Sequence, residues 1–143
     1  MTMLEFWIPD TTIHQPIPFV LEKISAGFPI EADGFIEASY DINEILIRNP
    51  SATFYARAKG NGLMATAGIG DGDILVVDKS VEPATNKLAI CVLYQQFTIR
   101  RLRVVNGEVF LVSDVNDHPP ISVDPYAEPS PLWGIITFVV KKV

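Results

Sequence analysis

Short apolar runs separated by turn signals make up most of the chain after residue 52. The runs are rich in β-branched and aromatic residues, and Gly, Asn, Asp and Pro gather between them, which is typical of strands. The predicted strands are Thr53–Lys59, Asp73–Asp78, Lys87–Leu93, Gln96–Val105, Glu108–Val112 and Leu132–Lys141. The strongest hairpin signal is Asn106-Gly107. Because no helical crossovers separate the strands, we predict a mainly β fold, with an antiparallel sheet curled into a barrel or sandwich.

One segment before these strands carries the signals of a helix. Asp41 can cap its first turn, Glu44 follows three residues later, and Pro50 ends the pattern. The segment Asp41–Arg48 is therefore predicted to form the one short helix of the chain.

The first 39 residues show no sustained helical or strand period. Prolines are frequent there, and they resist regular backbone pairing; they are Pro9, Pro16, Pro18 and Pro29. We therefore predict an extended N-terminal arm over residues 1–39 and a β domain over residues 40–143. Apolar residues of the arm, such as Phe6 and Trp7, indicate that it lies on another protein surface.

Length, charge and cysteine content narrow the class of protein. A chain of 143 residues that is 48% hydrophobic can form one domain with a real core. Its net charge of -6 argues against the broad positive field that direct DNA binding uses, so a role near DNA would need a protein partner. A lone Cys91 in an apolar run suits a reducing cytoplasm, and no stretch is long and apolar enough to span a membrane. We expect a cytoplasmic protein.

Glycines and aspartates after the first predicted strand could suggest a ligand site. The glycine-rich stretch from Gly60 to Gly72 is followed by no Lys-Ser or Lys-Thr pair, so it indicates a turn rather than a nucleotide cradle. Asp71 and Asp73 flank a glycine, where aspartate commonly bonds turn amides. The two histidines lie far apart and have no cysteine at ligand spacing. We expect neither a metal site nor a cofactor.

A basic run lies on the strand predicted at Gln96–Val105. Strand alternation places Arg100 with Leu102 on one face, and Arg101 with Ile99 on the other. From spacing alone, these are solvated arginines whose stems cover apolar surface.

Several stretches occur in an order that points to a known family. They are Ile24–Pro29, Asp41–Ile47, Asn49–Phe54, Gly68–Asp78, Phe97–Leu102 and Trp133–Ile136. In content and order they resemble UmuD-type proteins, relatives of the self-cleaving LexA repressors in the bacterial SOS DNA-damage response. The resemblance covers nearly the whole chain. It implies the family's C-terminal β fold, and it implies that Ala26-Gly27 matches the bond at which family members are cut.

The resemblance also implies a Ser nucleophile and a neutral Lys base, and neither is present here. The nucleophile position falls on Gly62 or Leu63, because the loop is one residue longer than the family's pattern. The lysine position falls on Arg100, whose guanidinium keeps its proton in proteins. Since a peptidase needs both a hydroxyl and a base, we predict no intact catalytic residue and an inactive peptidase.

Three neighbouring residues are weak substitutes for the missing pair. Thr66 and Ser51 carry hydroxyls, but the family's base position has no amine. Lys59, the nearest lysine in sequence, is interpreted as the exposed end of a strand. The extra loop residue indicates natural divergence rather than an engineered inactivation.

The leading hypothesis is a non-catalytic accessory subunit for a Y-family, UmuC-like translesion polymerase, acting as a homodimer or as a heterodimer with an active relative. Regulation by recombinase filaments is a further possibility that the family raises. Ala26-Gly27 could be cut in trans by an active partner or could persist as a plain arm segment. The alternative is an active serine-type autopeptidase with an unrecognised nucleophile. A LexA-like repressor is disfavoured because no helix-turn-helix precedes the β domain.

Overall fold

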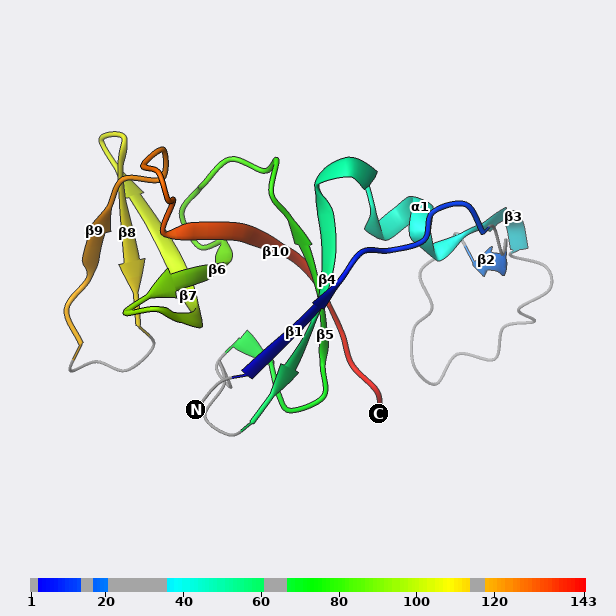
Figure 1. The fold of residues 1–143 in the computed structure, drawn as a ribbon. Helices are drawn as coiled ribbons and strands as arrows, with labels where there is room; N and C mark the ends of the chain where they lie inside the picture. Colours follow the sequence, from blue (N-terminus) through cyan, green and yellow to red (C-terminus); the bar gives the residue numbers. More distant parts are fainter. Residues whose placement is uncertain (1–2, 14–16, 21–35, 61–66, 114–117) are drawn as a thin grey trace, which may run out of the picture. The chain divides into compact units, whose positions relative to one another are not determined.

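A computed structural model describes residues 3–13, 17–20, 36–60, 67–113 and 118–143 of the chain. Its strands are β1 Met3–Trp7, β2 Ile17–Val20, β3 Ile36–Tyr40, β4 Thr53–Lys59, β5 Ile74–Asp78, β6 Leu88–Leu93, β7 Gln96–Val105, β8 Glu108–Val112, β9 Ile121–Val123 and β10 Leu132–Val140. The helix α1 spans Ile42–Leu46, and a 3-10 helix spans Pro50–Ala52. The predicted mainly β fold is confirmed (Figure 1).

Two sheets account for these strands. The larger has eight strands in the order β1-β4-β5-β10-β6-β7-β8-β9, and every neighbouring pair is antiparallel. The smaller pairs β2 with β3. By their contacts the residues form two compact units: Met1–Pro9 with Asn49–Val143, which contains the large sheet, and Asp10–Arg48.

The predicted helix and hairpin are both confirmed. The side chain of Asp41 accepts a hydrogen bond of 3.0 Å from the amide of Asn43, which caps α1. Asn106 and Gly107 join β7 to β8 with φ angles of 50° and 79°, the left-handed pair that a tight hairpin turn requires.

Strands in the first 39 residues and β9 were not predicted. The prolines argued against regular pairing across the whole segment, but none of them lies within β1. Pro18 does lie within β2, where it is tolerated because a two-stranded sheet consists only of edge strands. The pairing of β1 with β4 places the N-terminus in the large sheet, while the division of the chain at residue 39 stays a prediction.

The large sheet buries apolar side chains on both faces of its central strands. One cluster contains Ile90 of β6, Ile99 of β7 and Ile136 of β10, together with residues of β4 and β5. The other contains Ala89, Cys91, Leu102 and Ile135 from the same three strands, together with residues of β8. Alternate residues of β6, β7 and β10 thus point into different clusters, as strand geometry requires.

The turn between β6 and β7 holds side chains in an unfavourable backbone conformation. Tyr94 and Gln95 have φ angles of 52° and 64°, although neither is Gly or Asn. Each such residue costs about 1 kcal/mol relative to glycine, because its Cβ crowds the backbone. Tyr94 is 90% exposed, so its packing does not offset this cost.

We predict that Gln95→Gly raises the free energy of unfolding by about 1 kcal/mol, because glycine adopts a positive φ without strain. Urea unfolding followed by circular dichroism would measure the change. Gln96→Gly at the next position, within β7, is the matched control and should lower stability by about 0.5–1 kcal/mol. A shift in the same direction for both variants would refute the role of the turn.

Candidate functional site

The candidate site is the base of the loop between β4 and β5, where the resemblance places the nucleophile. Gly62, Leu63 and Thr66 lie outside the residues that the structure describes, as do Ala26 and Gly27. The flanks of the loop are described, and backbone bonds join them: Ala58 donates to Asp73 over 2.9 Å, and Gly72 donates to Ala58 over 2.7 Å. Both ends of the loop are therefore held together at the end of β4.

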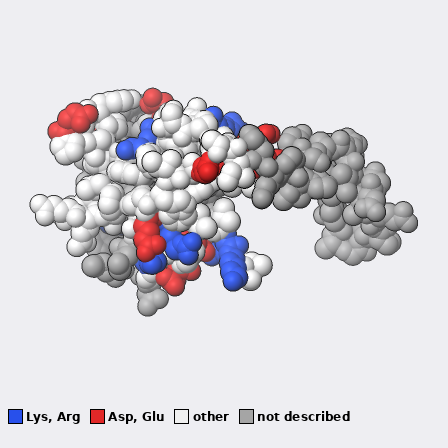
Figure 2. Space-filling model, turned by 45° about the vertical axis from the view of Figure 1, so that its right-hand side comes forward, with Lys and Arg blue, Asp and Glu red and all other residues white. Residues whose placement is uncertain are grey.

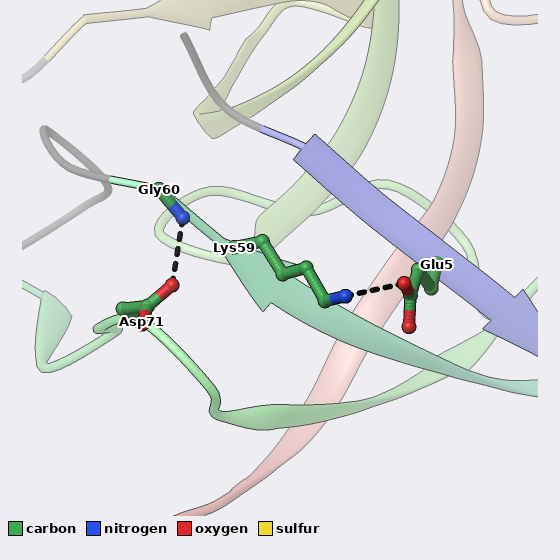
Figure 3. A network of polar contacts seen from close by, with 4 residues as sticks. All are labelled: Glu5, Lys59, Gly60 and Asp71. Carbon is green, nitrogen blue, oxygen red and sulfur yellow. Dashed lines mark hydrogen bonds and ion pairs between the residues drawn. The ribbon is translucent and has the colours of Figure 1, made fainter.

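Asp71 ties this base to the end of β4. Its carboxylate accepts a hydrogen bond of 2.8 Å from the amide of Gly60 (Figure 3). Next to this contact, Lys59 forms an ion pair of 2.5 Å with Glu5 of β1 (Figure 3). The hydrogen bond from Lys59 lowers the pKa of Glu5 against the opposing effect of burial, and the charges of Lys59 and Arg57 lower it further. Lys59 is thus engaged in an ion pair with Glu5.

Asp73 is the buried carboxylate of the same turn. It accepts a hydrogen bond of 2.8 Å from the Gly70 amide and forms an ion pair of 2.6 Å with Lys141. Burial is the largest single influence and raises the pKa of this carboxyl, but the hydrogen bonds from Lys141 and Gly70, with the charge of Lys141, outweigh it. The pKa of Asp73 consequently lies below its usual value. Its predicted role in bonding turn amides is confirmed.

Asp78, at the end of β5, is buried in a similar way. It accepts hydrogen bonds from the Asn49 side chain at 3.0 Å and from the amide of Ser80 at 2.8 Å. Burial again opposes ionisation, and the bonds from the Ser80 hydroxyl, Asn49 and the Ser80 amide overcome it, so the pKa is lowered. Across the described ranges, no group of three or more His, Cys, Asp or Glu side chains is placed to hold a metal ion.

Arg100, which the resemblance places at the family's lysine position, lies on β7 opposite Ala89. Its side chain is half-buried on the face that also carries Leu102. The charge of Arg100 acts on Cys91, which lies two residues from Ala89 along β6. Burial raises the pKa of the Cys91 thiol to about 12, while the charge and the backbone amide of Arg100 oppose this rise. A guanidinium in this position supplies a fixed positive charge and cannot accept a proton.

A cluster of aromatic side chains packs beside one of the two core clusters of the large sheet and was not foreseen from sequence. Phe6, Phe54, Phe97 and Trp133 come from four different strands, and their ring centroids lie 4.5–6.2 Å apart. The ammonium of Lys79 lies 4.5 Å from the ring centroid of Trp133, a cation-π geometry. No local period connects these positions, so only the curl of the sheet brings them together.

Lys79 and Trp133 also line two shallow cavities. One of about 210 Å³ includes Glu82 and Tyr126, and the other, of about 500 Å³, includes Glu128 and Val92.

On the face drawn in Figure 2, Lys and Arg side chains are interspersed with Asp and Glu side chains. Among the helices that the structure describes, none is long and apolar enough to cross a membrane.

Comparison with known proteins gives concordant matches over most of the chain. The profile of the Peptidase S24-like family matches residues 18–137. Protein MucA of Escherichia coli is 36% identical over 121 residues, which cover 85% of this chain and 82% of MucA. Protein SamA of Salmonella typhimurium is 31% identical over 130 residues, covering 91% and 89%. The LexA repressor of Vibrio cholerae is 30% identical over 122 residues, covering 85% of this chain but 57% of the repressor.

We predict that stability falls as the pH drops below about 5, because Asp73 and Asp78 protonate near pH 3.8 in the unfolded chain but only at lower pH in the folded protein. Each depressed pKa adds stability above its unfolded value, and this stability is lost as the pH falls through the folded value. Asp73→Asn should lower the free energy of unfolding at pH 7 by roughly 1–3 kcal/mol and should flatten its acid dependence. Urea titrations from pH 7 to about pH 2 would measure both effects.

Glu128→Gln, at an exposed carboxylate, is the control and should leave the dependence of stability on pH unchanged. If the stability of Asp73→Asn fell as steeply with pH as that of the wild type, the assignment would be contradicted.

Proposed function

The chain belongs to the Peptidase S24-like family and has UmuD-like relatives along most of its length, and we propose that it serves SOS mutagenesis as a non-catalytic accessory subunit. The family assignment that the sequence motifs predicted is thereby confirmed. The proposal of a non-catalytic role rests on the chain's own residues at the positions where the family has its dyad.

The observation that carries the proposal is the arginine at position 100. Self-cleavage in this family needs a neutral amine beside a hydroxyl nucleophile, and burial can produce a neutral lysine but not a neutral arginine. Arg100 keeps its place on β7, opposite Ala89, and presents a permanent cation. Position 62 is glycine and position 63 is leucine, so neither register of the loop supplies a nucleophile. The chain keeps the family's β fold but lacks the hydroxyl and the amine that its self-cleavage requires.

The partners follow from the family rather than from the site. We infer a homodimer, or a heterodimer with an active UmuD-like protein, that binds a Y-family, UmuC-like polymerase in the cytoplasm. The net charge of -6 supports a role through protein contacts rather than through direct DNA binding. Recombinase filaments are a further partner that such a subunit could meet.

The alternative function is a serine-type autopeptidase that cuts its own Ala26-Gly27 bond. What favours it is the retained small-residue-Gly pair. Against it stand the ion pair of Lys59 with Glu5 and the exposed position of Ser51 in the 3-10 helix, because neither supplies a nucleophile beside a neutral base.

We predict that the purified chain keeps its full mass during prolonged incubation at alkaline pH, where neutral amines and self-cleavage in this family are favoured. Intact mass spectrometry reads the result, with a self-cleaving family member as the positive control. A second reaction mixes the chain with that active protein, and we expect a cut between Ala26 and Gly27 that Ala26→Trp abolishes. Cleavage of the chain alone would establish the autopeptidase instead, and an uncut chain in the mixture would remove cleavage in trans.

We predict that the chain is retained by an immobilised UmuC-like polymerase in stoichiometric amounts. Affinity co-purification measures this, and a LexA-type repressor with the same β domain is the control that should pass through. Clean absence of binding, with circular dichroism confirming that both proteins are folded, would count against the accessory role.

A further inference from the structure

The N-terminal strand β1 lies on the open edge of β4 as a peptide ligand would. Its five residues pair antiparallel with β4 in unbroken register, from Met3 opposite Lys59 to Trp7 opposite Tyr55. The other edge of β4 is occupied by β5, so β1 takes the edge that would otherwise expose unpaired backbone groups. Addition of an extended strand to such an edge is a common mode of peptide recognition.

The inward side chains of β1 fit a shaped surface. Leu4 and Phe6 stand opposite Ala58 and Ala56, two fully buried residues whose small side chains leave room for larger ones. The ring centroid of Phe6 lies 4.5 Å from that of Trp133 and 4.9 Å from that of Phe97. Phe97 belongs to β7, five places from β1 in the strand order, so the contact between Phe6 and Phe97 joins two strands that are far apart in the sheet.

The outward side chains of β1 meet cationic groups. Glu5 forms the ion pair with Lys59 (Figure 3), and Trp7 lies under the guanidinium of Arg57 at 5.7 Å and against Tyr55. On the inner side, Lys79 stacks on Trp133. Two cations, Lys59 and Arg57, thus contact the strand in a chain whose net charge is negative, which favours an acidic residue between apolar ones in a strand that binds there.

A long stretch of chain connects β1 to β4. The chain leaves β1 through Ile8 and Pro9 and returns to β4 only after residues 10–48, which form the second compact unit. Because no short turn joins β1 to β4, its own pairing and packing hold it in place, and an external strand can compete with it by mass action.

We propose that the β4 edge, together with Phe54, Phe97 and Trp133, forms a strand-binding groove for an extended segment of a partner protein, and that β1 is its intramolecular competitor. The occupant has the pattern of β1 itself: an apolar residue, an acidic residue, then an aromatic anchor that enters the cluster in place of Phe6. The proposal goes beyond the accessory function, and it is tested on the isolated full chain with no polymerase, so the two can fail separately.

The test uses a fluorescent peptide of residues 1–9 and four forms of the full-length protein. Phe6→Ala removes the anchor of β1, and Glu5→Lys sets a cation against Lys59 while keeping the apolar side chains of β1. Ile8→Ala is the matched control, because Ile8 follows β1 and is 72% exposed. Fluorescence polarisation should give a dissociation constant at least about tenfold lower for Phe6→Ala and Glu5→Lys than for wild type and Ile8→Ala, because both variants raise the fraction of open groove.

Peptide variants test the recognition pattern in the same assay. A peptide with Phe6→Ala should lose binding to the Glu5→Lys protein, and a peptide with Glu5→Lys should bind the Phe6→Ala protein about tenfold more weakly than the native peptide. Equal affinity for all four proteins would overturn the proposal, because the peptide would then bind elsewhere. Absence of binding to a folded Glu5→Lys protein would also overturn it, and this variant decides the matter if Phe6→Ala does not fold. Self-association of the variants without peptide binding would assign the groove to a second copy of the chain and refute a partner strand.

Discussion

The burial of apolar side chains on both faces of β6, β7 and β10 is the constraint on which the rest of the large sheet depends. Ile90, Ile99 and Ile136 point to one side, while their neighbours Ala89, Leu102 and Ile135 point to the other. Strands with two buried faces must be covered on each side; residues of β4 and β5 complete the cluster on one side, and residues of β8 complete the cluster on the other. Since β10 lies between β5 and β6, the last strand of the chain joins the two halves of the sheet.

Buried carboxylates hold the base of the loop between β4 and β5 through polar contacts. Asp73 and Asp78 are buried and satisfied by amides, a hydroxyl, an amide side chain and Lys141. Buried carboxylates are costly without such partners, so these bonds keep the ends of β5 in place whatever side chains occupy the loop before it. Arg100 lies opposite Ala89 on β7, and its guanidinium cannot act as a proton acceptor.

The aromatic cluster joins the two ends of the strand order. Phe6 from the edge strand β1 packs against both Phe97 of β7 and Trp133 of β10, at centroid distances of 4.9 Å and 4.5 Å. This contact adds side-chain packing to the backbone pairing of β1 with β4, although most residues between the two strands pack as a different unit. A strand that is held to its sheet by pairing and packing rather than by a short turn can serve both as structure and as ligand.

The sequence by itself determined the features that depend on neighbouring residues. Strands β4, β7 and β8 have the predicted bounds, Asp41 caps α1, and Asn106-Gly107 forms the hairpin turn, because alternation, capping and turn conformations are local. The sequence also shows an arginine at position 100, and this residue type alone decides that its side chain cannot serve as a base. Only the tertiary structure decided the order of the strands, the place of β1 on β4 and the aromatic cluster, because these depend on which distant faces can be buried together. The prolines near β1 obscured its strand pattern, and long-range burial of Leu4 and Phe6 outweighed that local signal.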